Sequence, residues 1–253
     1  LKKFQAYLKG SRSIGNRTVI NHLVVIRSIF SQAIKDGIVD AKYYPFGKDK
    51  IRIKFPDSIK IGLTIEEVRQ IEDIELKQGS YVNHARNLWL LSFYFAGMRV
   101  SDLLRLQWDD FQDDRLYYAM GKNQKAGSFK VSEKALKILA QYEYRKAANK
   151  TFVFPELDSL INLDDLYTSQ RKISYAVKSI NESLAKVAET SEVKKKLTMH
   201  IARHTFGNIS GDKIPIQMLQ KLYRHSSIVT TIGYQSNFIH KDADDALDAV
   251  VNF

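Results

Sequence analysis

Residues 198–207 read TMHIARHTFG, and this stretch says most about the fold. Its apolar residues recur at helical spacing, which predicts a helix over the stretch and the two residues after it. His200 and His204 occupy positions i and i+4 of that helix, the spacing of a metal-binding pair. Ile201 stands where the H-E-x-x-H zinc motif has its glutamate, and no acidic or cysteine ligand clusters nearby. A metal site is therefore not expected, and Arg203 becomes the residue to explain.

Helical spacing also dominates the chain on both sides of this stretch. Further helices are predicted near residues 19–34, 64–73, 80–96, 103–106, 133–146, 163–187 and 215–224. Two short runs, 116–120 and 129–131, flank Gly127 and predict a small β-hairpin. The expected fold class is mainly α with a small antiparallel β-sheet.

Local signals set several of the boundaries. Thr64 and Glu67 have the spacing of a capping box, which predicts a helix start. Gly97 should end the long apolar helix before it, and Ser101-Asp102 should cap the next short helix.

Breakers between residues 44 and 56 read as a linker. The chain is expected to form a helical domain over 1–57 and a second, α+β domain over 63–253 that ends in a tail helix. Because Leu1 opens in what reads as the middle of a helix, the first domain is expected to be truncated at its N-terminus.

The charge of the chain is uneven. The formal net charge is +11, and residues 1–62 alone contribute +9, with 13 basic and 4 acidic side chains. A basic segment of this kind is either a solvated surface or a site for phosphate neutralisation, and charge alone does not separate DNA, RNA and other polyanions. The absence of cysteine fits a reducing cytoplasm, and no apolar run is long enough to span a bilayer.

Four pieces of the second domain, in order, resemble the tyrosine recombinase (phage integrase) family. They are GMRVSDLLRLQW, GKNQKAGSFK, TMHIARHTFG and LYRHSSIVTTIGY. Each piece alone is weak, and the joint order and spacing carry the resemblance. The residues that match the family's catalytic positions are Arg99, Lys125, His200, Arg203, His225 and Tyr234.

The resemblance implies an α+β catalytic domain that cleaves and rejoins DNA without metal, nucleotide or other cofactors. Tyr234 would attack the scissile phosphate and form a 3′-phosphotyrosyl link, with His200 as its base or hydrogen-bond partner. Arg99 and Arg203 suit the phosphate, because a guanidinium stays charged and offers a planar fork of donors. His225 would support the phosphate.

Lys125 would protonate the departing 5′ oxygen, although Lys122 lies three residues away and competes for that role. Lys122 is otherwise expected to contact DNA, together with Arg17 and Arg27 of the first domain. That domain is similar to the family's core-binding domain. The basic segment and the YPF linker resemble integrases of bacterial mobile elements such as transposons and conjugative elements, which implies an enzyme of the bacterial cytoplasm, at the nucleoid.

Three positions depart from the family pattern: Arg224 stands where glycine is common, Ala126 where threonine is common, and Gly233 directly precedes Tyr234. Gly233 is expected to make the position of the nucleophile flexible. Residues 242–251 carry an apolar stripe that either folds back on its own domain or, as in the family, docks on a neighbouring protomer in a homotetramer on two DNA sites.

Three other functions stay open at this point. A DNA-binding protein could keep the fold and lose catalysis, and a housekeeping chromosome-dimer resolvase would share every catalytic residue. A metal-dependent nuclease would need the carboxylates between Asp109 and Asp114, which read as a solvated turn.

Overall fold

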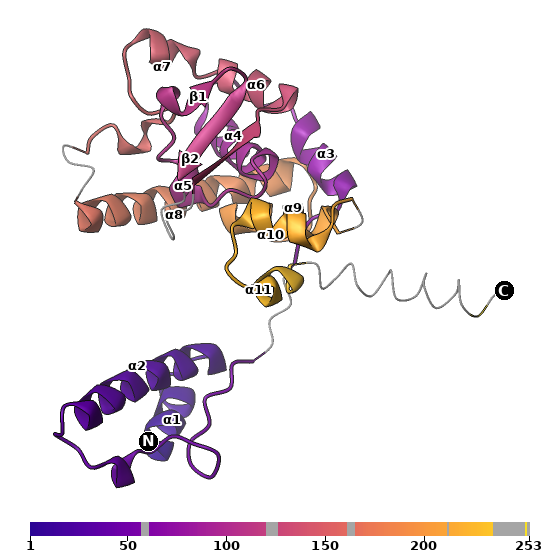
Figure 1. The fold of residues 1–253 in the computed structure, drawn as a ribbon. Helices are drawn as coiled ribbons and strands as arrows, with labels where there is room; N and C mark the ends of the chain where they lie inside the picture. The colour runs from indigo at the N-terminus through magenta and orange to yellow at the C-terminus, as the bar shows by residue number, and fades with distance from the viewer. Residues whose placement is uncertain (57–60, 120–125, 161–164, 212, 235–250, 252–253) are drawn as a thin grey trace. The chain divides into compact units, whose positions relative to one another are not determined.

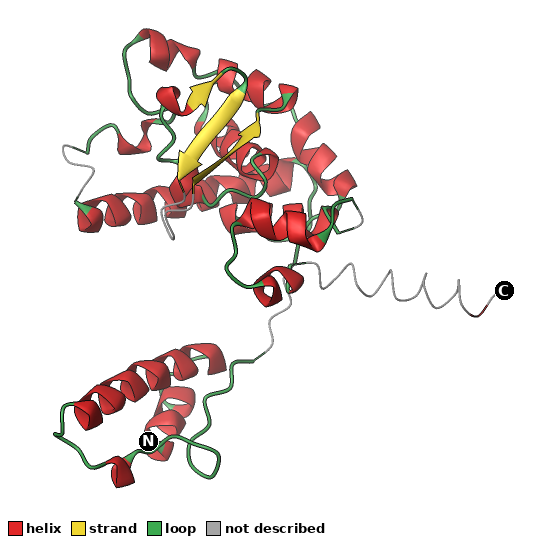
Figure 2. Cartoon of the chain, viewed as in Figure 1, coloured by secondary structure: helices red, strands yellow, loops and turns green. Residues whose placement is uncertain are grey.

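The computed structural model describes residues 1–56, 61–119, 126–160, 165–211, 213–234 and 251. The chain divides into two compact units, Leu1–Ile59 and Lys60–Phe253. Both are mainly helical, and the second contains one small antiparallel sheet, as predicted (Figures 1 and 2). Within the described ranges, no helix is both long and apolar enough to cross a membrane.

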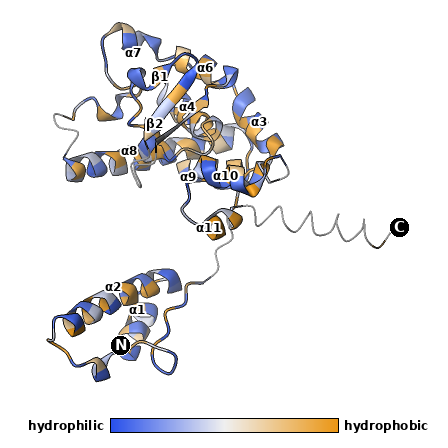
Figure 3. Cartoon of the chain, in the orientation of Figure 1, coloured by the Kyte–Doolittle hydropathy of each residue, from blue (hydrophilic) through white to orange (hydrophobic). Residues whose placement is uncertain are grey.

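The first unit is built on an amphipathic helix. Its elements are α1 (Lys2–Gly10), α2 (Asn16–Lys35) and the short 3-10 helix η1 (Ala41–Tyr43). Val19 and Leu23 of α2 are buried together with Leu8 of α1. Figure 3 shows the polar and apolar residues of α2 interleaved along the helix. The predicted helix is therefore confirmed, because its apolar residues find a partner in α1.

The second unit is organised around one long buried helix, α4 (Tyr81–Tyr94). It packs against α6 (Glu133–Ala140), α8 (Leu166–Thr190) and α9 (Met199–Ile209). Leu88, Trp89 and Leu91 of this helix are completely buried. Trp89 also donates a hydrogen bond from Nε1 to the carbonyl of Thr198, at 3.2 Å. The helices of this unit, in order, are α3 (Ile65–Asp73), α4, α5 (Val100–Leu103), η2 (Trp108–Asp110), α6 (Glu133–Ala140), α7 (Glu143–Ala147), η3 (Pro155–Leu157), α8 (Leu166–Thr190), α9 (Met199–Ile209), α10 (Ile216–Tyr223) and α11 (Ile228–Ile232).

The sheet has one strand more than the predicted hairpin. Strands β1 (Phe111–Gln112), β2 (Arg115–Ala119) and β3 (Ala126–Lys130) pair antiparallel in the order β1-β2-β3. In the β2–β3 register, Tyr118 lies opposite Gly127. β1 forms because residues 113 and 114 both adopt positive φ and return the chain onto β2. The stretch predicted to be a solvated turn is therefore partly strand.

Two other local predictions were wrong. The helix predicted over 133–146 is broken into α6 and α7, because the backbone departs from helical geometry at Tyr142, where φ is −110°. Ser101 and Asp102 do not cap their helix; Arg99 is the N-cap residue and α5 already contains both. The capping box of Thr64 and Glu67 is confirmed, with both of its hydrogen bonds present.

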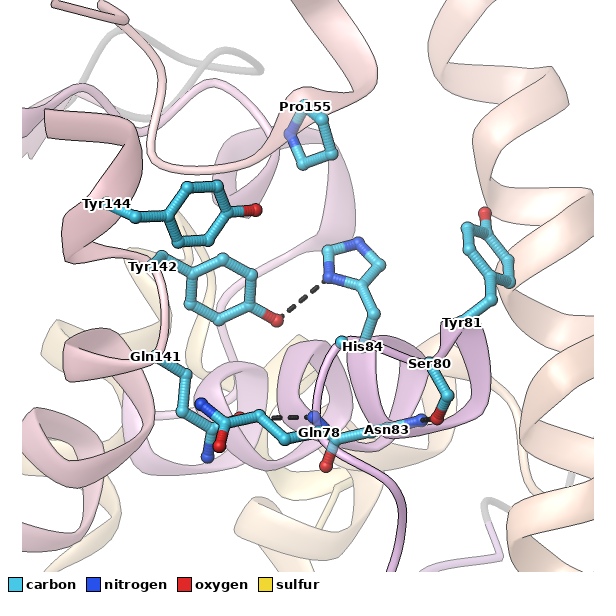
Figure 4. Close-up of a pocket in the computed structure, with 10 residues that line it drawn as sticks. Gln78, Ser80, Tyr81, Asn83, His84, Gln141, Tyr142, Tyr144 and Pro155 are labelled. Atoms are coloured by element: carbon cyan, nitrogen blue, oxygen red, sulfur yellow. Dashed lines mark hydrogen bonds between the residues drawn. The ribbon is translucent and has the colours of Figure 1, made fainter. Parts of the chain in front are cut away.

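A polar network ties the start of α4 to the α6–α7 junction and to η3. Figure 4 looks into a cavity of about 500 Å³ lined by these three segments. The two ring nitrogens of His84 lie 2.8 Å from Tyr142 Oη and 2.7 Å from Glu156 Oε1. Asn83 and Asn87 both donate to the side-chain oxygen of Gln141. These hydrogen bonds join side chains of three segments, so the network acts as a cross-link between helices.

Candidate active site

Arg203 is the centre of the site. It lies on α9 and is only 2% exposed. Nη1 donates to the carbonyl of Gly97 at 2.8 Å, and Nη2 donates to the carbonyl of Tyr223 at 3.2 Å. The guanidinium carbon also lies 3.8 Å from the centre of the Tyr223 ring, within range of a cation–π contact. Three contacts from two distant segments therefore fix the orientation of this cation.

Tyr223 supports Arg203 from below, and no sequence pattern singled it out. Its ring is fully buried beneath Arg203, and its hydroxyl donates back to the carbonyl of Arg203. Burial raises the pKa of the Tyr223 phenol well above its usual range, so the ring stays neutral. In the sequence, Tyr223 only continues the apolar spacing of α10, and that pattern predicts a core residue.

Gly97 lets the chain pass close to Arg203. Its φ of +68° is favourable for glycine, and a Cβ at this position would lie 3.0 Å from Arg203 Cα. Two residues later, Arg99 begins α5 as its N-cap residue. The pKa of Arg99 is lowered, first by burial and then by the positive charge of Arg203, while Asp102 and Tyr234 oppose the shift. The two arginines are therefore near enough to repel each other.

His225 joins this group from the turn after α10. Its Nε2 lies 3.1 Å from Nη2 of Arg203, and its Nδ1 lies 3.0 Å from Oγ1 of Thr231. A guanidinium can only donate, so Nε2 accepts this hydrogen bond. The contact with Arg203 therefore favours the tautomer in which Nδ1 carries the proton and donates it to Thr231.

The ring of Tyr234 lies among these residues. Its centre is 5.0 Å from that of Tyr223, 5.1 Å from that of His204 and 5.5 Å from that of His225. The guanidinium carbon of Arg203 lies 5.7 Å from the same ring. The backbone N–H of Tyr234 donates to the carbonyl of Thr231 at 2.9 Å, which continues the turn of α11.

Two glycines bear on the placement of Tyr234. Gly207 of α9 leaves room for it, because a Cβ on Gly207 would lie 2.8 Å from Tyr234 Cβ and 3.0 Å from Tyr223 Oη. Gly233 has ordinary right-handed helical geometry, with φ −62° and ψ −10°. No unusual backbone conformation at Gly233 is therefore needed to bring Tyr234 to Arg203.

His200 reaches this group through His204. The two rings pack edge to face with centres 4.5 Å apart, and His204 in turn contacts Tyr234. His200 is the most exposed of these side chains. In the sequence, His204 stands out through its metal-ligand spacing from His200, and its place beside Tyr234 is set by tertiary packing. Within the described ranges, no group of three or more His, Asp or Glu side chains is arranged to hold a metal ion.

The remaining predicted residues lie elsewhere. Lys122 and Lys125 fall outside the described residues, as does the predicted tail helix apart from Val251. Arg17 and Arg27 lie on exposed positions of α2 in the first unit, where the guanidinium of Arg17 lies 5.3 Å from the Phe55 ring centre.

The described site combines two neighbouring guanidiniums, a histidine and a phenol. Guanidiniums hold a phosphate through paired, charge-assisted hydrogen bonds. A phenol has a pKa near 10 and needs help to ionise at neutral pH, which an adjacent cation or a base supplies. The arrangement is suited to nucleophilic attack by an oxygen on a phosphodiester.

Comparisons with known proteins place the chain in a family. Residues 63–240 match the phage integrase family, and residues 1–53 match the phage integrase SAM-like domain. A Sinorhizobium fredii protein described as an integrase/recombinase, y4qK, is 24% identical over 239 residues, which are 92% of this chain and 69% of that protein. Tyrosine recombinase XerC of Caldanaerobacter subterraneus is 26% identical over 79% of this chain and 52% of its own length.

Solved structures show the same fold at low identity. An integrase of the Tn1549 transposon, in complex with transposon right end DNA, matches with a TM-score of 0.67 and 15% identity over 100% of this chain and 84% of that one. A lambda integrase dimer bound to a core site matches with a TM-score of 0.64 and 15% identity, over 92% and 77%. With the family match covering most of the sequence, the chain belongs to the phage integrase family, the tyrosine recombinases, whose members cleave and rejoin DNA by transesterification.

Proposed function

We propose that this protein is a site-specific DNA recombinase that integrates or excises a mobile element through a 3′-phosphotyrosyl intermediate on Tyr234. The observation that carries the proposal is the contact of the Tyr234 ring with the buried guanidinium of Arg203 and with His225. A nucleophile, a phosphate-binding cation and a hydrogen-bonding histidine thereby share one site. Its place of action would be the chromosome in the bacterial cytoplasm.

In the proposed reaction, the phenol oxygen of Tyr234 attacks the phosphorus, and the bond from phosphorus to the 5′ oxygen breaks. The phenol proton passes to His200, and the leaving 5′ oxygen takes a proton from Lys125. Arg99 and Arg203 stabilise the charge that develops on the non-bridging oxygens, a contribution worth several kcal/mol for preorganised donors. The reverse steps rejoin the DNA, and the covalent link conserves the energy of the broken bond.

The decisive experiment traps the covalent intermediate. A nicked DNA substrate that loses a short fragment after cleavage should leave a protein–DNA adduct with the wild type in EDTA. Tyr234→Phe should form none, because it lacks the attacking oxygen, while Tyr175→Phe, which changes an exposed tyrosine of α8, should behave as wild type. Failure of the wild type to form an adduct would favour a DNA-binding protein without catalysis. Adduct-free cleavage that stops in EDTA would favour a metal-dependent nuclease.

The partners of the proposed reaction are two DNA sites and three further copies of this chain. Arg17, Arg27 and Lys122 would contact the DNA backbone, where each phosphate contact releases counterions. The tail over residues 242–251 would dock on a neighbouring protomer, because its apolar stripe needs a surface to cover it.

Deleting residues 240–253 should abolish recombination between two sites. Binding of a single copy to one half-site should persist, because the proposed DNA-binding residues are retained. Recombination assays and gel-shift titrations of the same preparation measure the two properties. Recombination at the wild-type level after the deletion would reject the tail exchange.

A further inference from the structure

Arg224 ends α10 in a left-handed conformation, with φ 52° and ψ 37°. Helices often end in this conformation, and glycine is the usual residue because it has no Cβ to strain the backbone. A non-glycine residue persists at such a position only when its surroundings hold it there. The side chain of Arg224 should therefore make contacts that glycine would lose.

Those contacts reach both strands of the β2–β3 hairpin. Nη1 of Arg224 donates to the carbonyl of Tyr118 in β2 at 3.1 Å, and its guanidinium carbon lies 4.0 Å from the centre of the Tyr118 ring. On β3, a Cβ on Gly127 would lie only 2.7 Å from Nη2 of Arg224. Tyr118 and Gly127 are paired in the register. The guanidinium thus covers one cross-strand pair, close to where β2 ends and β3 begins.

In the sequence, Arg224 lies between Tyr223 and His225, which both contact Arg203. Tyr223 accepts a hydrogen bond from Arg203 at its carbonyl, and His225 accepts one from Arg203 at Nε2. The turn itself is held by Gln220, which donates to the carbonyl of His225 and accepts from its N–H. Tyr223 and His225 therefore hold Arg203, while Arg224, which lies between them, contacts the hairpin.

We infer that Arg224 is a positioning residue that clamps the β2–β3 hairpin to the His225 turn. Lys125 lies between β2 and β3 in the sequence and outside the described residues, so the catalytic consequence rests on the function proposed above. A lysine cannot replace Arg224, because only a planar guanidinium can stack on the Tyr118 ring and also donate a hydrogen bond to the Tyr118 carbonyl. The clamp acts through the hairpin and not on the phosphate.

The first test measures the hairpin directly, without DNA. Hydrogen–deuterium exchange should show the amides of 115–119 and 126–130 exchanging about tenfold faster in Arg224→Gly than in wild type, the effect expected for losing a charge-assisted hydrogen bond. Arg224→Lys should show the same direction. Lys221→Ala removes another positive charge of α10 beside the same strand and should exchange as wild type. Equal exchange in wild type and Arg224→Gly would overturn the clamp, whatever the enzyme does.

The second test measures the reaction. Arg224→Gly removes the strain of a side chain in a left-handed conformation, so the variant should fold. It should nevertheless cleave an ordinary phosphodiester roughly tenfold to a hundredfold more slowly, because the proposed acid Lys125 would be misplaced. A 5′-bridging phosphorothiolate has a leaving group that needs no proton, so it should restore cleavage by Arg224→Gly. Arg203→Lys, defective in holding the phosphate, should stay slow on both substrates.

Wild-type cleavage by Arg224→Gly, or a loss that persists on the phosphorothiolate, would overturn the catalytic part of the inference. A wild type that forms no adduct would instead count against the proposed function. A Lys125→Ala variant that the phosphorothiolate does not rescue would count against the role of Lys125, and the exchange measurement would still decide on the clamp.

Discussion

At the scale of single residues, the site depends on side chains that are absent as much as on those that are present. Gly97 admits the backbone of Arg203, and Gly207 admits Tyr234. Neither glycine could be given this role from the sequence, because each is explained by a neighbour more than 25 positions away. Long-range proximity of this kind is set by the packing of helices.

Gly207→Ala should slow cleavage by about tenfold to a hundredfold, because the new Cβ would meet Tyr234 Cβ at 2.8 Å and displace the nucleophile. The fold should tolerate the change, since alanine favours helix over glycine by about 1 kcal/mol. Single-turnover cleavage and urea unfolding of the same preparation would separate these effects.

Gly10→Ala is the matched control, because Gly10 is also helical and a Cβ there would meet nothing within 4 Å. It should leave cleavage unchanged. Equal cleavage by Gly207→Ala and wild type would show that Tyr234 does not need the position described.

Several site residues could be predicted from the sequence because four motifs occur together in one order. Arg203, His225 and Tyr234 were singled out by the family resemblance, and the structure places them together. Tyr223 could not be predicted as a site residue, since the sequence pattern of a buried aromatic residue in a helix is the same beside an active site as in a core. The contact of Arg224 with Tyr118 joins residues 106 positions apart, and no local pattern contains it.

At the scale of elements, predictions succeeded where a boundary is encoded locally. The Thr64 capping box depends on a few adjacent residues. The long helix expected to end at Gly97 ends three residues earlier, at Tyr94. Predictions failed where tertiary contacts decide. β1 has only two residues and exists through its pairing with β2, and the helix predicted over 133–146 is interrupted at Tyr142, whose side chain is buried in the core.

The network around His84 gives an element-scale prediction. His84→Ala should lower the free energy of unfolding by about 3 kcal/mol, because it leaves Tyr142 Oη and the carboxylate of Glu156 buried without this partner. The Glu156 side chain is only 6% exposed, so water cannot easily replace the lost bond. Urea unfolding monitored by tryptophan fluorescence measures the change.

Tyr144→Phe is the matched control, because Tyr144 lines the same cavity but is 66% exposed. Its effect should stay within about 0.5 kcal/mol. Similar losses in the two variants would show that the network does not link the elements as described.

At the scale of the whole molecule, composition and periodicity were enough for the fold class, and the order of motifs was enough for the family. The mainly helical fold with one small sheet is confirmed. The activity of the assembled protein on DNA stays a prediction, because docking on DNA and between protomers depends on surfaces that a single sequence does not order in space.

Arg203 is almost completely buried, and the pKa of Arg99 is lowered first by burial and then by the positive charge of Arg203. Folding therefore brings two like charges together at a cost, and an anion between them would relieve that repulsion. Part of the favourable free energy of phosphate binding would thus come from relieving the repulsion between Arg99 and Arg203. By linkage, a substrate that binds only the folded form raises its stability. The free energy of unfolding would then be highest when the protein is bound to its DNA substrate.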